Sequence, residues 1–192
     1  SFATINGVYN TVYGALGIAS VPIVNVLSKR FGKRHTLLAG LCCVAFGFLI
    51  SPLLFNPELP YLQIGVAALA SPGLACVWVL TSSMLADVTD EDELATGLRR
   101  EGMFGAAFGL LIKLGLAGVM ALSGVIIDWS GFDPESANQS VATQQFLRFF
   151  FAGAPLFFLA CAFTLVWQFP LTRARMAEIK EQLAAMHNAN PD

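Results

Sequence analysis

Long apolar stretches separated by short polar turns dominate this sequence. Five of them run for about 20 residues or more and are nearly free of charge: Gly7–Leu27, Thr36–Phe55, Tyr61–Ala86, Gly102–Ile127 and Phe146–Phe169. At about 1.5 Å per residue, a helix of this length crosses the roughly 30 Å hydrocarbon core of a bilayer. A soluble helix would carry charges on its outer face, whereas these stretches are apolar all round. The pattern predicts an all-α membrane protein with five transmembrane helices.

The pattern changes after Pro170. Met176, Ile179, Leu183 and Met186 recur at spacings of three and four residues among polar neighbours. This period is typical of a short amphipathic helix that lies along a membrane interface. We therefore divide the chain into a transmembrane bundle, residues 1–170, and a tail helix, residues 171–192.

Composition and charge support a membrane protein and give it an orientation. The chain is 56% hydrophobic and 12% charged, whereas soluble domains are about one quarter charged. Nine of the eleven Lys and Arg residues follow the first, third and fifth stretches: Lys29, Arg30, Lys33, Arg34, Arg99, Arg100, Arg173, Arg175 and Lys180. Because positive turns stay in the cytoplasm, we expect an inner- or plasma-membrane protein with its N-terminus outside and its C-terminus cytoplasmic.

The sequence carries no signature of an enzyme or a metal site. All four cysteines fall inside apolar stretches, where reduced thiols behave as small hydrophobes. No CxxC pair, phosphate-binding loop, GxSxG or HExxH motif is present. We therefore expect no catalytic activity, no bound metal, no organic cofactor and no nucleic-acid partner. The chain also opens without Met, so we expect an upstream part of the same polypeptide to be missing.

Two stretches carry unusual polar features. Asn6, Asn10 and Tyr13 are spaced i, i+4, i+7 and so share one face of the first helix. They either hydrogen-bond to a neighbouring helix or line a cavity. In the third stretch, Ser71-Pro72-Gly73 predicts a helix break at membrane depth. Trp78 lies about 12 Å inside the charged boundary, deeper than an interfacial belt, and serves either packing or substrate binding.

Lys113 is the residue of the apolar stretches whose insertion into a bilayer costs the most free energy. It lies 11 residues from Gly102 and 14 from Ile127, or roughly 16 and 21 Å from the ends of its helix. Its side chain cannot reach either interface, and insertion scales assign a central Lys about +2.5 to 3.5 kcal/mol. Such residues face a bundle interior and mark substrate or ion pathways. The alternative is a structural pair with a carboxylate, but the five stretches contain no acid at that depth.

The turn after the third stretch is acidic at its start and basic at its end. Asp87, Asp90 and Glu93 follow one another at helical spacing, and Arg99, Arg100 and Glu101 come next. These charges form a solvated face, or they pair with one another and with the basic turn at residues 29–34. In the second case the pairs would act as a gate that opens and closes.

These residues together resemble a known family. The run from Cys76 through Trp78 and Met84–Glu93 to Arg99–Gly102, followed by Lys113-Leu-Gly, is similar to the C-terminal half of the glycoside–pentoside–hexuronide:cation symporters. This family is a branch of the major facilitator superfamily. The resemblance implies that the five stretches are the last five helices of a six-helix C-terminal bundle. It also implies membrane lipid and a missing N-terminal half as partners.

The resemblance also assigns roles to single residues. Trp78 matches the family's sugar-stacking tryptophan, and Lys113 matches a lysine near its sugar and coupling-ion site. Asp87, Asp90, Glu93, Arg99 and Glu101 match a cytoplasmic loop motif. The basic turn, with Lys29, Arg30 and Arg34, would complete a cytoplasmic gate. Asn10 and Tyr13 are further candidates for substrate binding. The family's cation-binding acids lie in its N-terminal half, so a coupling Na⁺ or H⁺ would bind outside this chain.

We therefore expect part of a secondary active transporter that takes up a glycoside, pentoside or hexuronide by alternating access. Two alternatives stay open. Part of the family has polar residues one turn before the lysine, where this chain has Phe108 and Gly109, and this favours an amphipathic or lipid-like solute. The other alternative is a membrane sensor or assembly subunit that transports nothing.

Overall fold

The computed structural model describes residues 2–54, 60–136 and 139–189. Over these ranges the chain forms α-helices, one short 3₁₀ turn and no strand. The helices are α1 (Phe2–Phe31), α2 (Lys33–Leu54), α3 (Gln63–Thr96), α4 (Glu101–Trp129), α5 (Val141–Trp167) and α6 (Arg173–Ala189). Helices α1 to α5 are long and apolar enough to cross a membrane. The predicted all-α membrane fold is confirmed. Phe55, the predicted end of the second span, and residues 190–192 of the tail lie outside the described residues.

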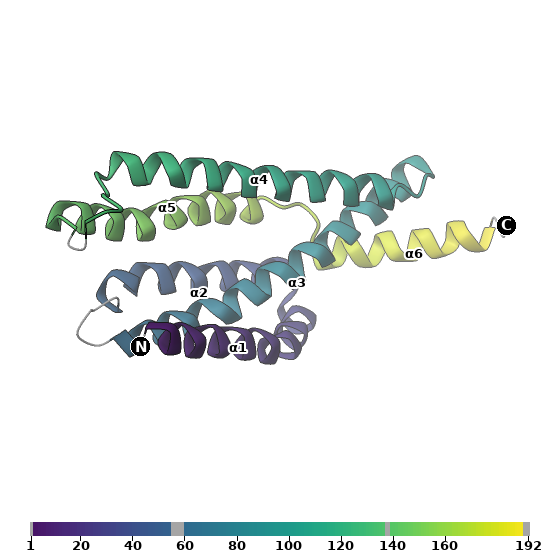
Figure 1. Cartoon of the computed structure of the whole chain (residues 1–192). Coiled ribbons are helices and arrows are strands. Elements are labelled where there is room, and N and C mark those ends of the chain that lie inside the picture. The colour runs from purple at the N-terminus through teal and green to yellow at the C-terminus, as the bar shows by residue number, and fades with distance from the viewer. Residues whose placement is uncertain (1, 55–59, 137–138, 190–192) are drawn as a thin grey trace.

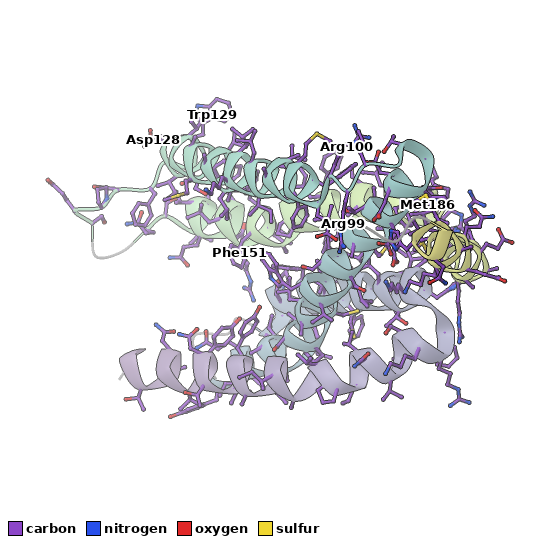
Figure 2. The ribbon with its side chains drawn as sticks, turned by 90° about the vertical axis from the view of Figure 1, so that its right-hand side faces the viewer. Arg99, Arg100, Asp128, Trp129, Phe151 and Met186 are labelled. Carbon is purple, nitrogen blue, oxygen red and sulfur yellow. The ribbon has the colours of Figure 1, made fainter. Side chains whose placement is uncertain are left out.

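Consecutive spanning helices run in opposite directions, and the N- and C-termini lie at opposite ends of the bundle (Figure 1). Arg99 and Arg100 lie at one end of α4, and Asp128 and Trp129 lie at the other (Figure 2). We call the first of these the basic end: it holds the α1–α2 turn, the α3–α4 turn and the start of α6. Helix α3 extends past α1, α2 and α5 there, and α6 lies beside this extension (Figure 1).

The core forms around α2 and α3. Helix α2 packs against both α3 and α5, and α1 packs against α3. Val24, Leu37, Cys76, Leu80 and Met84 form the buried apolar cluster between them. Helices α2 and α3 approach most closely at glycine residues, which have no side chain.

Glycines permit this approach. A Cβ added to Gly73 would lie 2.6 Å from the carbonyl oxygen of Gly40, and one added to Gly40 would lie 2.8 Å from Cys76 Sγ. Small residues at such crossings let helix backbones come together, as is usual between membrane helices.

The expected break at Ser71–Gly73 was wrong. Helix α3 continues from Gln63 to Thr96 with Pro72 inside it. Neighbours hold the helix on both sides of the proline, because Ser71 Oγ donates to the Tyr13 carbonyl at 2.5 Å and Gly73 packs on α2. Membrane helices tolerate proline where such neighbours are present. The helix ends only at Gly97, a left-handed cap at φ 68°.

The tail helix buries its apolar face against α3. Its apolar side chains, Met176, Ile179 and Leu183, form a buried cluster with Leu171, and this cluster packs against Val88 and Leu94 of α3. Ile179 is 0% exposed. The extension of α3 therefore covers the face that the sequence alone assigned to the membrane interface.

Helix α4 contrasts with every other α-helix of the described chain. None of its residues is buried, and large apolar side chains such as Leu111, Leu116 and Met120 are exposed along it. Its contacts with the rest of the described chain are mainly with α3.

Candidate functional site

Trp78 and Lys113 lie at similar depths on neighbouring helices. Trp78 precedes Asp87 by nine residues and Lys113 follows Glu101 by twelve, so they stand about 14 and 18 Å from the basic end along their helices. The Trp78 side chain is 60% exposed. Lys113 is exposed on α4 and makes no hydrogen bond or ion pair with the described residues. Both side chains are thus open to a partner.

Asn10 and Tyr13 lie farther from the basic end. Tyr13 stacks on Tyr9 with ring centroids 6.3 Å apart, and its carbonyl oxygen accepts the hydrogen bond from Ser71. Ser71 precedes Trp78 by seven residues, so the two leave α3 in directions about 20° apart and about 10 Å apart along the axis. The structure therefore places Tyr13 beside α3, two turns beyond Trp78, and Asn10 nearly one turn beyond Tyr13. No described contact joins either residue to Lys113.

Asp87 is the most deeply paired charge at the basic end. Its two carboxylate oxygens each lie 2.7 Å from Lys33 Nζ, and Nζ also donates to the Ser83 carbonyl at 3.1 Å. Asp87 is 5% exposed. A carboxylate taken out of water is stable only when a cation and hydrogen bonds compensate it. The pair thereby fixes the start of α2 to α3.

The other cations of the basic turn have different surroundings. Arg34 donates to the main-chain oxygens of Trp167 and Phe169, and its guanidinium stacks on the Trp167 ring. Arg30 lies over the ring of Phe31. Lys29 is exposed and forms no ion pair with the described residues. The structure therefore gives Asp87 the partner Lys33 rather than Lys29, Arg30 or Arg34.

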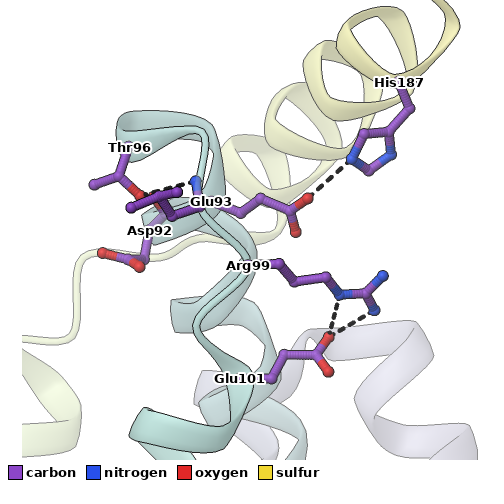
Figure 3. A network of polar contacts seen from close by, with 7 residues as sticks. Asp92, Glu93, Thr96, Arg99, Glu101 and His187 are labelled. Carbon is purple, nitrogen blue, oxygen red and sulfur yellow. Dashed lines mark hydrogen bonds and ion pairs between the residues drawn. The ribbon is translucent and has the colours of Figure 1, made fainter. Parts of the chain in front are cut away.

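The α3–α4 turn holds three separate charged pairs. Arg99 donates from Nε and Nη2 to Glu101 Oε1 at 2.9 and 2.7 Å, and Glu93 Oε1 lies 2.9 Å from His187 Nε2 of α6 (Figure 3). Arg100 forms the third pair, with Asp92. The hydrogen bond and charge of Glu101 raise the pKa of Arg99, with smaller contributions from Glu93 and Asp90. The predicted gate residues of this turn thus share one electrostatic environment.

Four members of these pairs are absent from the predicted gate residues: Lys33, Asp92, Arg100 and His187. Asp92 is eight residues from Arg100, so the charge pattern of the turn was a readable signal. Lys33 is 54 residues from Asp87 and His187 is 94 residues from Glu93. Only the fold brings those pairs together.

The described residues offer no obvious metal site. No group of three His, Cys, Asp or Glu side chains in this part of the chain is arranged to hold an ion. The cysteines are free, and the carboxylates near the basic end are mostly taken up by Lys, Arg and His partners.

Long apolar helices that alternate in direction, with most of the cations at one end, define a polytopic α-helical membrane protein. The chain belongs to the glycoside–pentoside–hexuronide:cation symporter family of the major facilitator superfamily, since the family model described as MFS/sugar transport protein matches residues 4–173. This is a family of transporters rather than enzymes.

Curated relatives agree with this assignment. The chain is 37% identical over 130 residues to the uncharacterized symporter sll1374 of Synechocystis sp.. This match covers 65% of this chain and 24% of that protein. It is 29% identical over 164 residues to the glucuronide carrier protein homolog of Escherichia coli, covering 84% and 35%. It is 27% identical over 183 residues to the isoprimeverose transporter of Lactiplantibacillus pentosus, covering 92% and 37%.

The chain thus spans between about a quarter and somewhat more than a third of the length of these relatives. No solved structure matches it.

Proposed function

We propose that the complete polypeptide containing this chain is a secondary active transporter that takes up a glycoside, pentoside or hexuronide together with Na⁺ or H⁺. Membership of a sugar-transport family supports this proposal, and so do relatives named for carrying a glucuronide and isoprimeverose. Carriers of this kind rock two bundles around a site near the middle of the bilayer.

Lys113 is the observation that carries the proposal. The described chain gives this cation no carboxylate, although its helix places it about 18 Å from the nearer end. A lysine at that depth is stable where it faces a polar pathway or meets an anionic partner. We assign it to binding substrate, or to organising acids of the other bundle that bind the coupling cation.

The remaining predicted residues fit around this role. Trp78, exposed at a similar depth, stacks on the apolar face of the sugar ring. Asn10 and Tyr13 line the pathway farther from the basic end. The charged pairs at the basic end form a gate, with Asp87 held by Lys33 and Glu93 held by His187.

Orientation and partners follow from the same scheme. The basic end faces the cytoplasm, because positively charged turns are retained there, and the start of this chain lies outside. The exposed surface of α4 packs against the other bundle of the transporter. Membrane lipid covers the outer faces of α2 and α5.

The test is uptake by the complete polypeptide in proteoliposomes, with a glucuronide and isoprimeverose as labelled substrates. Lys113→Ala is expected to abolish uptake at normal expression. Trp78→Ala is expected to raise KM about tenfold, the equivalent of about 1.4 kcal/mol of lost stacking and burial. Leu114→Ala, next to Lys113, and Trp78→Phe serve as matched controls that keep most of the activity. Normal kinetics in both alanine variants would contradict the site.

An amphipathic solute is the competing outcome. Phe108, five residues before Lys113 on α4, supplies an aromatic apolar side chain rather than a polar one. If a lysophospholipid is transported and competes for Lys113-dependent uptake while neither sugar does, the site binds an amphipathic solute instead of a sugar.

A further inference from the structure

A cleft opens at the basic end between the α1–α2 turn, α3 and the start of α6, and its volume is about 670 Å³. The cations and the histidine in its lining are Lys29, Lys33, Arg34, Arg173, Lys180 and His35. Asp87 is the only acidic residue among the described residues that line it. The cleft is therefore strongly positive.

The charges inside the cleft do not balance. Lys33 engages both oxygens of Asp87, and Arg34 binds neutral main-chain oxygens. Its Nε is buried without a hydrogen-bond partner. Lys29, Arg173 and Lys180 form no ion pair with the described residues. Four cations thus share one cleft without a counter-charge, and their mutual repulsion is relieved when an anion enters.

The walls of the cleft indicate what kind of anion fits. Phe31, Met84, Leu171 and Met176 supply apolar surface next to the cations. Phe31 and Trp167 are exposed at the ends of α1 and α5, where aromatic side chains mark the headgroup level of a bilayer. The first turn of α6 adds the positive end of a helix dipole. A ligand that joins a phosphate to an apolar body matches this combination better than a fully hydrated anion does.

We propose that this cleft holds the phosphate group of an anionic phospholipid, whose glycerol and acyl portion lies on the apolar wall. The proposal rests on the orientation given under Proposed function, because anionic lipids and the basic sites that bind them are found on the cytoplasmic side. The lipid would connect the α1–α2 turn to the tail helix, two segments that lie far apart in the sequence.

The test measures lipid binding by the complete polypeptide, without using transport. Purified protein is titrated with fluorescent phosphatidylglycerol in phosphatidylcholine nanodiscs, and then with the same lipid in the presence of millimolar inorganic phosphate. The test variant is Arg173→Gln with Lys180→Gln. The matched control is Arg30→Gln with Arg175→Gln, which removes two cations from the same end but outside the cleft. Arg173→Lys with Lys180→Arg keeps both charges.

The test variant is expected to bind phosphatidylglycerol about ten- to thirty-fold more weakly, because it removes two of the four cleft cations that no carboxylate of the described residues neutralises. The control and the charge-preserving variant should stay within about threefold of the parent protein. Equal weakening in test and control variants, or none in either, overturns the site. If inorganic phosphate displaces the phosphatidylglycerol completely, the cleft is a phosphate site, and the proposal that its ligand is a lipid is overturned. Because transport is not the readout, failure here is distinguishable from failure of the transport proposal.

Discussion

Asp87 shows how strongly a single carboxylate at the basic end depends on one partner. It is 5% exposed, while the Lys33 side chain that binds it is 34% exposed. The contribution of this pair to stability should therefore be intermediate. Exposed ion pairs contribute up to about 1 kcal/mol, and disruption of buried ones costs about 3–5 kcal/mol. Loss of either partner should be felt in stability, because it leaves the other charge poorly compensated.

We predict that Lys33→Gln destabilises the complete polypeptide by about 2 kcal/mol, because it leaves the Asp87 carboxylate buried without a cation. Lys33→Gln combined with Asp87→Asn should cost less than the sum of the single changes, since both charges are then gone. Thermal unfolding in detergent measures the four proteins of this cycle. Lys29→Gln, in the same turn but without an ion pair to a described residue, is the control. Strict additivity would show that the pair contributes no coupling.

At the scale of elements, the close crossing of α2 and α3 depends on two glycines, which carry a hydrogen where other residues carry a side chain. Gly40 and Gly73 face each other with no room for a Cβ. At Gly73 a backbone atom, the Gly40 carbonyl oxygen, sets this limit, so no rotamer change relieves it, and a larger residue must push the helices apart.

We predict that Gly73→Ala lowers the stability of the complete polypeptide by about 1–3 kcal/mol, the range for overpacked cores. Its new methyl would meet the Gly40 carbonyl oxygen at 2.6 Å and Val44 Cγ2 at 2.6 Å. Gly153→Ala is the matched control, because a Cβ there meets nothing within 4 Å and alanine favours the helix. The melting temperature should fall for the first variant and stay level or rise for the second. Equal behaviour would place the two helices farther apart than described.

Docking of α6 belongs to the same scale. Leu171, Met176, Ile179 and Leu183 bind the tail to Val88 and Leu94 of α3, and the Glu93–His187 contact adds a polar link near its end (Figure 3). Ile179 is the centre of this cluster because its side chain is fully covered.

We predict that Ile179→Ala releases the tail helix, since truncating a fully buried isoleucine costs about 2–5 kcal/mol. Trypsin should then cleave at Arg173, Arg175 and Lys180 at least several-fold faster than in the parent protein, because local unfolding frees the helical backbone at these exposed residues for the protease. Gln182→Ala, on the exposed side of the same helix, should leave cleavage unchanged. Unchanged cleavage in Ile179→Ala would mean that the tail is held elsewhere.

At the scale of the whole molecule, the described chain has one well-packed side and one open side. Helices α1, α2, α3 and α5 share buried contacts, whereas α4, which carries Lys113, has no buried residue. Under the transport proposal this open side is where the second bundle sits, so the substrate site is shared between bundles. That arrangement agrees with relatives of which the matched part of this chain covers only 35% and 37%.

Hydrophobic patterning by itself determined the spanning helices, because a bilayer demands long uncharged segments with all backbone groups bonded within the helix. Motif spacing likewise indicated the family from residues between Trp78 and Lys113. The partners of Asp87 and Glu93, the continuity of α3 through Pro72 and the burial of the tail helix were decided only by the tertiary structure. Each depends on which atoms from distant segments come within bonding distance, and local sequence carries no record of that.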